Sequence, residues 1–228
     1  MSAENDTTVF TFKPVGYVRC DARYTQETPR QGVFSRRTAV IELQKGSNFE
    51  AALQDLDGVS HIWIIWVFDR VKNWKPLIQP PTSDRKIGVF ATRSPFRPNN
   101  IGLSSVRILS IDLHTPDGPV IEVEGADLMD GTPIFDIKPY LPFTDSHPDA
   151  LGGFAQEQNT AIEPLAVHFS DTLVSVFSAE RLLALRGILS ADPRPHYHAD
   201  EQRVYAFEFA GREVKFRVAD GEVEAWVE

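Results

Sequence analysis

The feature that most constrains the fold is a series of short strand-like segments filling most of the first 140 residues. Each is rich in apolar and β-branched residues, and Gly, Pro, Asn or Asp residues separate one segment from the next. Many short strands between regular turn signals are typical of a β-barrel or a β-sandwich. We therefore expect strands at Thr11–Arg19, Thr38–Leu43, His61–Phe68, Ile87–Thr92, Ser104–Leu113, Val120–Gly125 and Ile134–Tyr140.

The run Ile62–Phe68 is apolar at every position. A strand with two apolar faces is expected at the centre of a sheet, covered on both sides. The run has seven residues, whereas a membrane-spanning helix needs about 20. The first ten residues carry acids and no basic or apolar leader region, so we expect no secretory signal.

Local signals predict two further features of this part of the chain. A short helix is expected at Phe49–Leu56, capped by Ser47 or Asn48 and followed by Gly58. The turn residues 115–118, Thr-Pro-Asp-Gly, predict a hairpin between the two strands that flank them.

The C-terminal part has a different pattern. Residues 145–159 contain Pro, paired Gly and polar residues without a period, which is typical of a linker or a long loop. Ser178–Leu189 predicts a helix with an apolar stripe of Leu182, Leu183, Leu185 and Leu189, and three alternating segments separated by Ala210-Gly211 and Asp220-Gly221 predict a three-stranded meander. We therefore expect a mainly β protein, with an N-terminal β-barrel at residues 1–145, a linker at 146–164 and a small α+β domain at 165–228.

Charge is distributed unevenly along the chain. The formal net charge is −9, which by itself disfavours a nucleic-acid partner. Residues 69–107, however, hold eight basic residues and two acids, a net charge of +6 that leaves −15 for the rest. Such a basic region can guide an anionic ligand to one face of an acidic protein. Cys20 is the only cysteine, so no disulfide can form within the chain and a reducing, cytoplasmic setting is expected.

The loop that follows Gly88–Ala91 contains two arginines and two prolines, Arg93, Pro95, Arg97 and Pro98. Proline fixes φ and removes a donor, so this loop cannot pair as a strand and is stiffened. Arginine binds carboxylate or phosphate through two parallel hydrogen bonds. The loop is therefore a candidate anion site, although arginines in loops more often form structural salt bridges.

A second candidate lies in the segment 125–133, Gly-Ala-Asp-Leu-Met-Asp-Gly-Thr-Pro. Its carboxylates, Asp127 and Asp130, could accept hydrogen bonds from a ribose diol or an amino group, while an ordinary turn is the simpler interpretation. Glycine-rich dinucleotide and phosphate motifs are absent from the sequence, and the six histidines lack zinc-ligand spacing, so no Rossmann nucleotide site and no metal are expected.

Five stretches, in this order along the chain, resemble the TsaA-like family: PRQG at 29–32, SHIWIIWVF at 60–68, GVFATRSPFRPNNIGLS at 88–104, DLMDGTPIFDIKPYLPF at 127–143 and DPRPHY at 192–197. The resemblance implies a homodimeric, S-adenosylmethionine-dependent methyltransferase that acts on N6 of threonylcarbamoyladenosine at tRNA position 37. It implies a cofactor site on a TsaA-like β-barrel instead of a Rossmann sheet. The cofactor contacts that it implies are Pro29, Arg30, Gln31, Asp69, Arg70, Arg93, Leu103, Asp127, Leu128, Met129 and Asp130.

Methyl transfer to a urea-type N–H needs positioning and a base that removes the proton. Asp127, Asp130 and Asp136 are the candidate bases, and the sequence does not choose among them. Arg97, Asn99, Tyr140, Arg194 and Tyr197 are the candidate contacts to substrate or tRNA. Two alternatives stay open: a β-barrel that binds S-adenosylmethionine or another nucleotide without catalysis, and a methyltransferase for another RNA or a small molecule.

Overall fold

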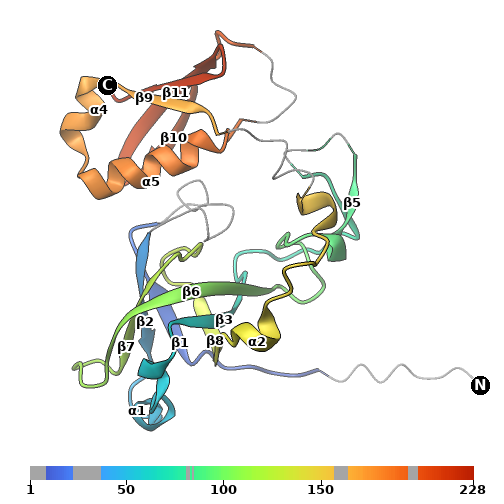
Figure 1. Cartoon of the computed structure of the whole chain (residues 1–228), viewed down its shortest axis with the longest axis vertical. Helices are drawn as coiled ribbons and strands as arrows, with labels where there is room; N and C mark the ends of the chain where they lie inside the picture. Colours follow the sequence, from blue (N-terminus) through green and yellow to red (C-terminus); the bar gives the residue numbers. More distant parts are fainter. Residues whose placement is uncertain (1–8, 23–36, 81–82, 84, 157–163, 195–199) are drawn as a thin grey trace, which may run out of the picture.

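The structure is a computed structural model, and it describes residues 9–22, 37–80, 83, 85–156, 164–194 and 200–228. Figure 1 shows a barrel formed by the first part of the chain and a second sheet, packed with helices, formed by the last part. In the described part of the chain, no helix is long and apolar enough to cross a membrane.

Six antiparallel strands close into a barrel in the order β1-β2-β7-β6-β3-β8. This confirms the predicted mainly β fold with an N-terminal barrel. Inward side chains from alternate positions, such as Ile41, Ile64 and Ile121, are fully buried and form its core. The strands are β1 (Gly16–Arg19), β2 (Thr38–Leu43), β3 (His61–Val67), β6 (Ile101–Asp112), β7 (Val120–Glu124) and β8 (Pro133–Pro139).

The first strand is shorter than predicted, because the pairing starts at Gly16 and not at Thr11. Pro14 has no N–H to donate to a ladder. The hairpin between β6 and β7 has the predicted turn, in which the hydroxyl of Thr115 donates to the carbonyl oxygen of Gly118 over 2.5 Å.

Strand β3 lies between β6 and β8, which confirms its predicted central place. Its side chains on the inner face are buried, whereas Trp63, Ile65 and Val67 on the outer face are only half-buried. The prediction that both faces are covered is therefore wrong for the single chain. The short helix α2 (Pro142–Asp145) is linked to this outer face, where the indole of Trp63 donates to Asp145 over 2.8 Å.

Between β3 and β6 the chain makes an excursion over residues 68–100. It contains the two-stranded ribbon β4 (Leu77–Ile78) and β5 (Ile87–Gly88), followed by a 3-10 helix at Val89–Ala91. The predicted strand Ile87–Thr92 is thus wrong after Gly88. The N–H of Val89 still pairs with Pro76, but Pro76 has no N–H to donate in return, so the ladder ends there and the carbonyl oxygen of Val89 accepts from the N–H of Thr92.

The predicted helix at Phe49–Leu56 is also interrupted. It consists of α1 (Phe49–Ala52) and a separate 3-10 helix at Leu56–Gly58, because Asp55 adopts a left-handed φ of 64° that an α-helix cannot include. Asn48 occupies the N-cap with a φ of 55°, and its side chain makes no capping hydrogen bond, so the predicted capping is wrong.

The C-terminal sheet has four strands in the order β10-β11-β12-β9. The predicted meander corresponds to β10 (Tyr205–Phe209), β11 (Arg212–Ala219) and β12 (Glu222–Trp226), and both predicted turns contain two successive residues with positive φ. The prediction of three strands is wrong because β9 (Ala166–Phe169) pairs in parallel with β12. A parallel partner comes from a distant segment, so no tight turn marks it in the sequence.

Two helices pack against this sheet: α4 (Asp171–Val176) and α5 (Ala179–Ser190). Ser178 caps α5, as its hydroxyl accepts from the N–H of Arg181. Leu185 and Leu189 are fully buried, but Leu183 is exposed, so the predicted stripe is narrower than expected.

Candidate functional site

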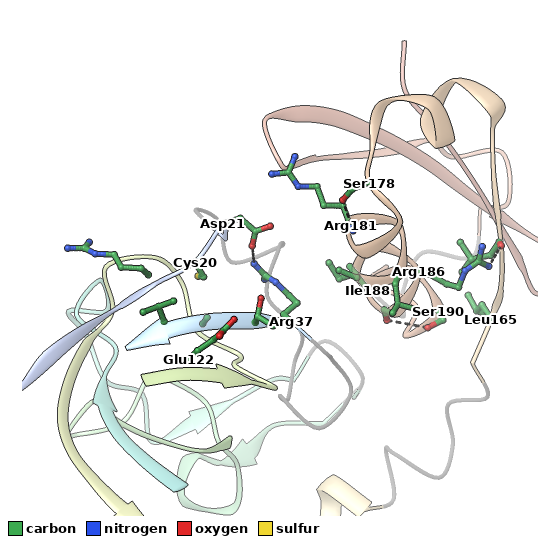
Figure 2. Close-up of a pocket in the computed structure, with 18 of the residues that line it drawn as sticks. Cys20, Asp21, Arg37, Glu122, Leu165, Ser178, Arg181, Arg186, Ile188 and Ser190 are labelled. Carbon is green, nitrogen blue, oxygen red and sulfur yellow. Dashed lines mark hydrogen bonds and ion pairs between the residues drawn. The ribbon is translucent and has the colours of Figure 1, made fainter. Parts of the chain in front are cut away.

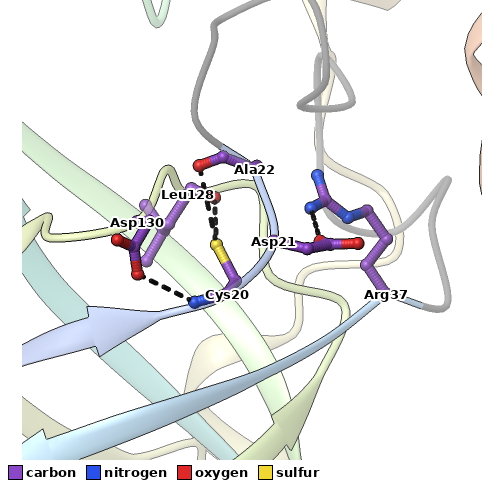
Figure 3. A network of polar contacts seen from close by, with 6 residues as sticks. All are labelled: Cys20, Asp21, Ala22, Arg37, Leu128 and Asp130. Carbon is purple, nitrogen blue, oxygen red and sulfur yellow. Dashed lines mark hydrogen bonds and ion pairs between the residues drawn. The ribbon is translucent and has the colours of Figure 1, made fainter. Parts of the chain in front are cut away.

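The acidic segment 127–132 forms a loop that is fixed to the end of strand β1 (Figure 3). The N–H of Asp130 donates to Ala22 over 2.7 Å, and the N–H of Cys20 donates to the Asp130 carboxylate over 3.2 Å. The thiol of Cys20 donates to the carbonyl oxygen of Leu128 over 3.4 Å, and burial raises the pKa of this thiol. Gly131 has a φ of 78°, which permits the turn back into β8.

The other end of the same loop is anchored inside the barrel. The indole N–H of Trp66 donates to the hydroxyl of Ser104 over 3.1 Å, and this hydroxyl donates to the carboxylate of Asp127 over 2.6 Å. Trp66 and Ser104 are both buried. Gly102 makes room for this arrangement, because a Cβ at that position would overlap the indole ring of Trp66.

The residues that follow β3 reach the acidic loop. Arg70 lies near Met129, with 3.8 Å between its guanidinium nitrogen and the thioether sulfur. Asp69 and Arg70 are both exposed. The structure therefore brings the predicted residues Arg70, Asp127, Met129 and Asp130 to one end of the barrel, with Leu128 buried beneath them.

The two arginines of the stiffened loop differ in their surroundings. Arg97 is half-buried and donates to the carbonyl oxygens of Val89 (3.0 Å) and Thr92 (2.6 Å). Arg93 is exposed and makes no hydrogen bond or ion pair with the residues that the structure describes. Arg97 thus holds the loop together, whereas the side chain of Arg93 is exposed.

The two neighbouring asparagines also differ: the side chain of one is bound within the protein and that of the other is exposed. Asn100 donates its side-chain amide to the carbonyl oxygens of Val71 (3.0 Å) and Pro95 (3.3 Å), and so ties both ends of the excursion together. The side chain of Asn99 is exposed, while its carbonyl oxygen accepts from Ile101.

Three predicted site residues lie on the outer face of the barrel, away from the acidic loop. Leu103 and Asp136 flank Ile65 on opposite sides, as both are its register partners in neighbouring strands. Asp136 forms an ion pair with Lys138 over 2.8 Å. Tyr140 packs against Trp63, with 5.5 Å between the ring centroids.

In the C-terminal part, Arg194 is bound to Asp192 by two hydrogen bonds of 2.9 Å. This pairing raises the pKa of the guanidinium. Predicted residues Pro29, Arg30, Gln31 and Tyr197 lie outside the described residues. In the sequence, the first three lie between Ala22 and Arg37, which are both described. The carbonyl oxygen of Ala22 accepts from the N–H of Asp130.

A cleft of about 920 Å³ lies between the barrel and helix α5 (Figure 2). None of the predicted site residues that the structure describes lines it, although Cys20 lies at its edge beside the acidic loop. Arg37 forms an ion pair with Asp21 here, and Arg186 donates to Val167 over 2.6 Å. The cleft is lined by four arginines, Arg19, Arg37, Arg181 and Arg186, and by two acids, Asp21 and Glu122.

The excursion between β3 and β6 carries a second candidate surface, here called the basic-aromatic surface. Its halves are joined by the β4–β5 ribbon and by a hydrogen bond of 3.0 Å from the N–H of Lys75 to Phe96. The ammonium of Lys75 lies 4.8 Å from the centroid of the Phe96 ring. The surface consists of the exposed residues Arg70, Lys72, Trp74, Lys75, Arg85, Lys86, Phe90, Arg93 and Phe96.

Basic side chains with interleaved aromatic rings suit single-stranded nucleic acid, since the charges follow phosphates and the rings stack on bases. Among the described residues no cluster of His, Cys, Asp and Glu could hold a metal ion. The arrangement therefore combines a loop rich in hydrogen-bond acceptors with a neighbouring exposed basic surface.

Two family models match the chain. The tRNA-methyltransferase O N-terminal domain matches residues 17–146, and the TrmO C-terminal domain matches residues 162–226. The chain belongs to the tRNA-methyltransferase O family. This confirms the predicted TsaA-like resemblance and the prediction of an enzyme of the tRNA methyltransferase class.

Relatives in the tRNA-methyltransferase O family cover the chain well. A protein of Escherichia coli (strain K12) named tRNA (adenine(37)-N6)-methyltransferase is 35% identical over 230 residues, which cover 95% of this chain and 97% of the relative. A protein of Eikenella corrodens with the same name is 46% identical over 168 residues, 71% of this chain and 92% of the relative. The crystal structure of TrmO from Pseudomonas aeruginosa aligns with a TM-score of 0.74 at 28% identity and covers 97% of each chain.

Sequence reasoning missed two residues that anchor the acidic loop inside the barrel, Trp66 and Ser104. The strand pattern assigned Trp66 to the core and gave Ser104 no role. One signal could have found the serine: it stands between Gly102 and Val106 on the inward face of β6, where a polar residue needs a partner.

Proposed function

We propose that this protein transfers a methyl group from S-adenosylmethionine to N6 of threonylcarbamoyladenosine at position 37 of tRNA. Relatives are named as enzymes for adenine 37 of tRNA and as S-adenosylmethionine-dependent proteins. The observation that carries the proposal is the meeting of the acidic loop, Arg70 and the end of β1 at one end of the barrel.

The residues at that end fit the cofactor. S-adenosylmethionine offers a ribose diol and an ammonium group as donors, and the carboxylates of Asp127 and Asp130 are acceptors held in place by Ser104 and Cys20. Its carboxylate needs a cation, which Arg93 supplies as an exposed guanidinium. When bound, the cofactor supplies an activated methyl group on a sulfonium, so no metal is needed.

The target nitrogen lies between the purine and the carbonyl group of a urea, so its lone pair attacks well only as the proton leaves. Asp127, Asp130 and Asp136 are the carboxylates proposed for this step. Of these, Asp136 already forms an ion pair with Lys138 over 2.8 Å. Separate Asp→Asn variants at the three positions identify the base as the one whose loss removes the alkaline plateau of kcat.

The basic-aromatic surface is the proposed tRNA-binding face. Its cations neutralise phosphates of the anticodon loop, and Trp74, Phe90 and Phe96 stack on unpaired bases. Exposed Asn99 extends the basic-aromatic surface, and Arg97 stabilises its loop through the hydrogen bond to Thr92. Tyr140 and Arg194 are weaker candidates, since Tyr140 packs on Trp63 and Arg194 is paired with Asp192.

We further propose the division of the chain into a catalytic barrel at 1–145, a linker at 146–164 and a C-terminal domain at 165–228 that contributes to tRNA binding. The four arginines of the cleft support a contribution of both parts to the binding of a polyanion. Because tRNA is modified and used in the cytoplasm, the protein is placed there.

The outer face of β6, β3 and β8 supports a homodimer. Ile101 and Leu103 are 45% and 49% exposed, and they lie beside the half-buried Ile65 and Val67. A second copy on this face would cover these side chains and bring Leu103 into a composite site. Ile101→Glu should shift the mass in sedimentation equilibrium from dimer to monomer, whereas Val204→Glu, at a residue 50% exposed elsewhere, should not.

The function is tested with S-adenosylmethionine that carries a labelled methyl group and with two forms of one tRNA, bearing or lacking the threonylcarbamoyl group. Label on the modified tRNA alone supports the proposal. Equal label on both forms contradicts the proposed substrate. Cofactor binding without transfer to either form favours a sensor, which binds the cofactor and catalyses nothing.

A further inference from the structure

The hydrogen bonds around Ser104 have a fixed direction. An indole N–H can only donate, so Trp66 takes one lone pair of the Ser104 hydroxyl. The hydroxyl has a single hydrogen, and its next neighbour is the carboxylate of Asp127 at 2.6 Å. The hydrogen therefore points at Asp127, and Asp127 accepts it.

The surroundings keep this direction from reversing. Ser104 is 5% exposed and Trp66 is 8% exposed, so water does not compete for either group. Phe68 packs on the Trp66 ring with 4.2 Å between centroids, and Gly102 leaves the space that the ring occupies. Asp127 is half-buried at the end of the barrel, and its hydrogen bond to Ser104 connects the buried Trp66 and Ser104 to the acidic loop.

We infer that Ser104 is a positioning residue that holds the Asp127 carboxylate as an acceptor for the methyl donor. A hydroxyl hydrogen directed at a carboxylate makes a short charge-assisted hydrogen bond and fixes the rotation of the group. Asp127 then offers acceptor capacity to the donor groups of the cofactor without reorganising when it binds. This inference rests on the proposed function, because it takes Asp127 to contact S-adenosylmethionine.

A purely structural role for Ser104 makes a different prediction. In that case replacing it would lower stability and leave the ligand affinity of the folded protein unchanged. Ser104 and Thr132 are the two buried polar side chains in the described residues, and Thr132 donates its hydroxyl to a carbonyl oxygen within its own turn. Ser104 instead donates to a residue of the ligand loop.

The test compares Ser104→Ala, Ser104→Cys and the control Ser110→Ala, at a temperature where each variant is folded by circular dichroism. Ser110 stands on the same strand, is exposed, and also donates to a carboxylate, that of Glu122. Titration calorimetry measures the Kd for S-adenosylmethionine, and steady-state kinetics measure kcat and the KM for the cofactor across pH.

Ser104→Ala should raise the Kd and the KM about tenfold, the loss expected for a hydrogen bond to a charged group. Because Asp127 is assigned to the cofactor and removal of the proton to Asp130 or Asp136, kcat and its pH profile at saturating cofactor should stay as in the unchanged protein. Ser104→Cys, whose thiol is a weaker donor, should have a Kd and a KM between those of Ser104→Ala and the unchanged protein. Ser110→Ala should have the same Kd and KM as the unchanged protein. An unchanged Kd for folded Ser104→Ala overturns the inference, as does a shifted pH profile of kcat with a normal KM.

Failure of the proposed function gives a different result. If the unchanged protein binds S-adenosylmethionine but methylates no tRNA, the function is wrong, yet the Kd ratio still decides the role of Ser104. If the unchanged protein is active and Ser104→Ala binds the cofactor equally well, the function stands and the inference is wrong.

Discussion

Arg97 donates its guanidinium to the main-chain carbonyl oxygen of Thr92 over 2.6 Å and so closes the loop from which Arg93 emerges. The same nitrogen donates to Val89 over 3.0 Å, and the guanidinium lies 5.5 Å from the Phe90 ring. One arginine of the motif thus stabilises the loop, and the other is exposed.

This difference predicts opposite effects for the two arginines. Arg97→Ala leaves the carbonyl oxygen of Thr92 without this donor and should lower the free energy of unfolding by about 1–3 kcal/mol. Arg93→Ala should leave the stability unchanged and weaken S-adenosylmethionine binding about tenfold or more. Thermal unfolding and calorimetry measure the two quantities. Arg93→Ala that folds and binds the cofactor normally would remove Arg93 from the site.

The close contact between Gly102 and Trp66 predicts that a single added methyl group lowers the stability of the fold. In Gly102→Ala the new Cβ would overlap the buried indole ring, so the ring must shift. Overpacking of this kind costs about 1–3 kcal/mol of unfolding free energy. Gly58→Ala is the control, because nothing lies within 4 Å of a Cβ there. Urea unfolding should separate the two variants; equal midpoints would show that the indole is free to move.

The hydrogen bond between Trp63 and Asp145 predicts a pH-dependent local change. Hydrogen bonds from the N–H of Leu141 and from the indole of Trp63 lower the pKa of Asp145. A lowered pKa means that the carboxylate stabilises the folded state above the ordinary pKa of an aspartate, about 3.9, and that this contribution disappears as the pH falls through the lowered value.

Tryptophan fluorescence should therefore change in acid as α2 separates from β3, before the barrel unfolds. Asp145→Ala should show the acid-type spectrum at neutral pH and lose that transition. A spectrum of Asp145→Ala identical to that of the unchanged protein at neutral pH would contradict this role of α2.

The basic-aromatic surface predicts a salt-dependent weakening of tRNA binding. Lys72→Ala combined with Lys75→Ala removes two exposed cations and should lower the slope of log K against log salt by about 0.7–0.9 for each phosphate that is no longer neutralised. Arg212→Ala removes an exposed cation at the start of β11 and serves as the control. Equal slopes for both variants would place the tRNA on another face.

Much of the barrel could be predicted because its strands and turns are local. β2 has the predicted bounds, and β3 and β7 each end one residue before theirs. The errors arose where partners distant in sequence decide the structure. The strand ends after Gly88 because Pro76, the next partner in register, has no N–H to donate to Val89, and β9 forms because β12 lies beside it.

The site shows the same division. Its motifs located the acidic loop and the arginine loop, and the structure places Arg70 beside Met129 as the family motifs imply. The roles of individual side chains could not be predicted, since whether Arg97 or Arg93 is free to bind depends on the carbonyl oxygens around each. The inward position of Ser104 on β6 indicates that it needs a partner but not which one, because the partner, Asp127, is 23 residues away in the sequence.

The central claim is that the methyl group reaches N6 of threonylcarbamoyladenosine. The most direct measurement digests tRNA labelled by the purified protein to nucleosides and identifies the labelled nucleoside by mass spectrometry before and after mild alkali. We expect label on the purine fragment of threonylcarbamoyladenosine that survives alkali, because an N-methyl group is stable there. Label that alkali releases, as from a methyl ester of the threonyl carboxylate, or label on unmodified adenosine would contradict the claim.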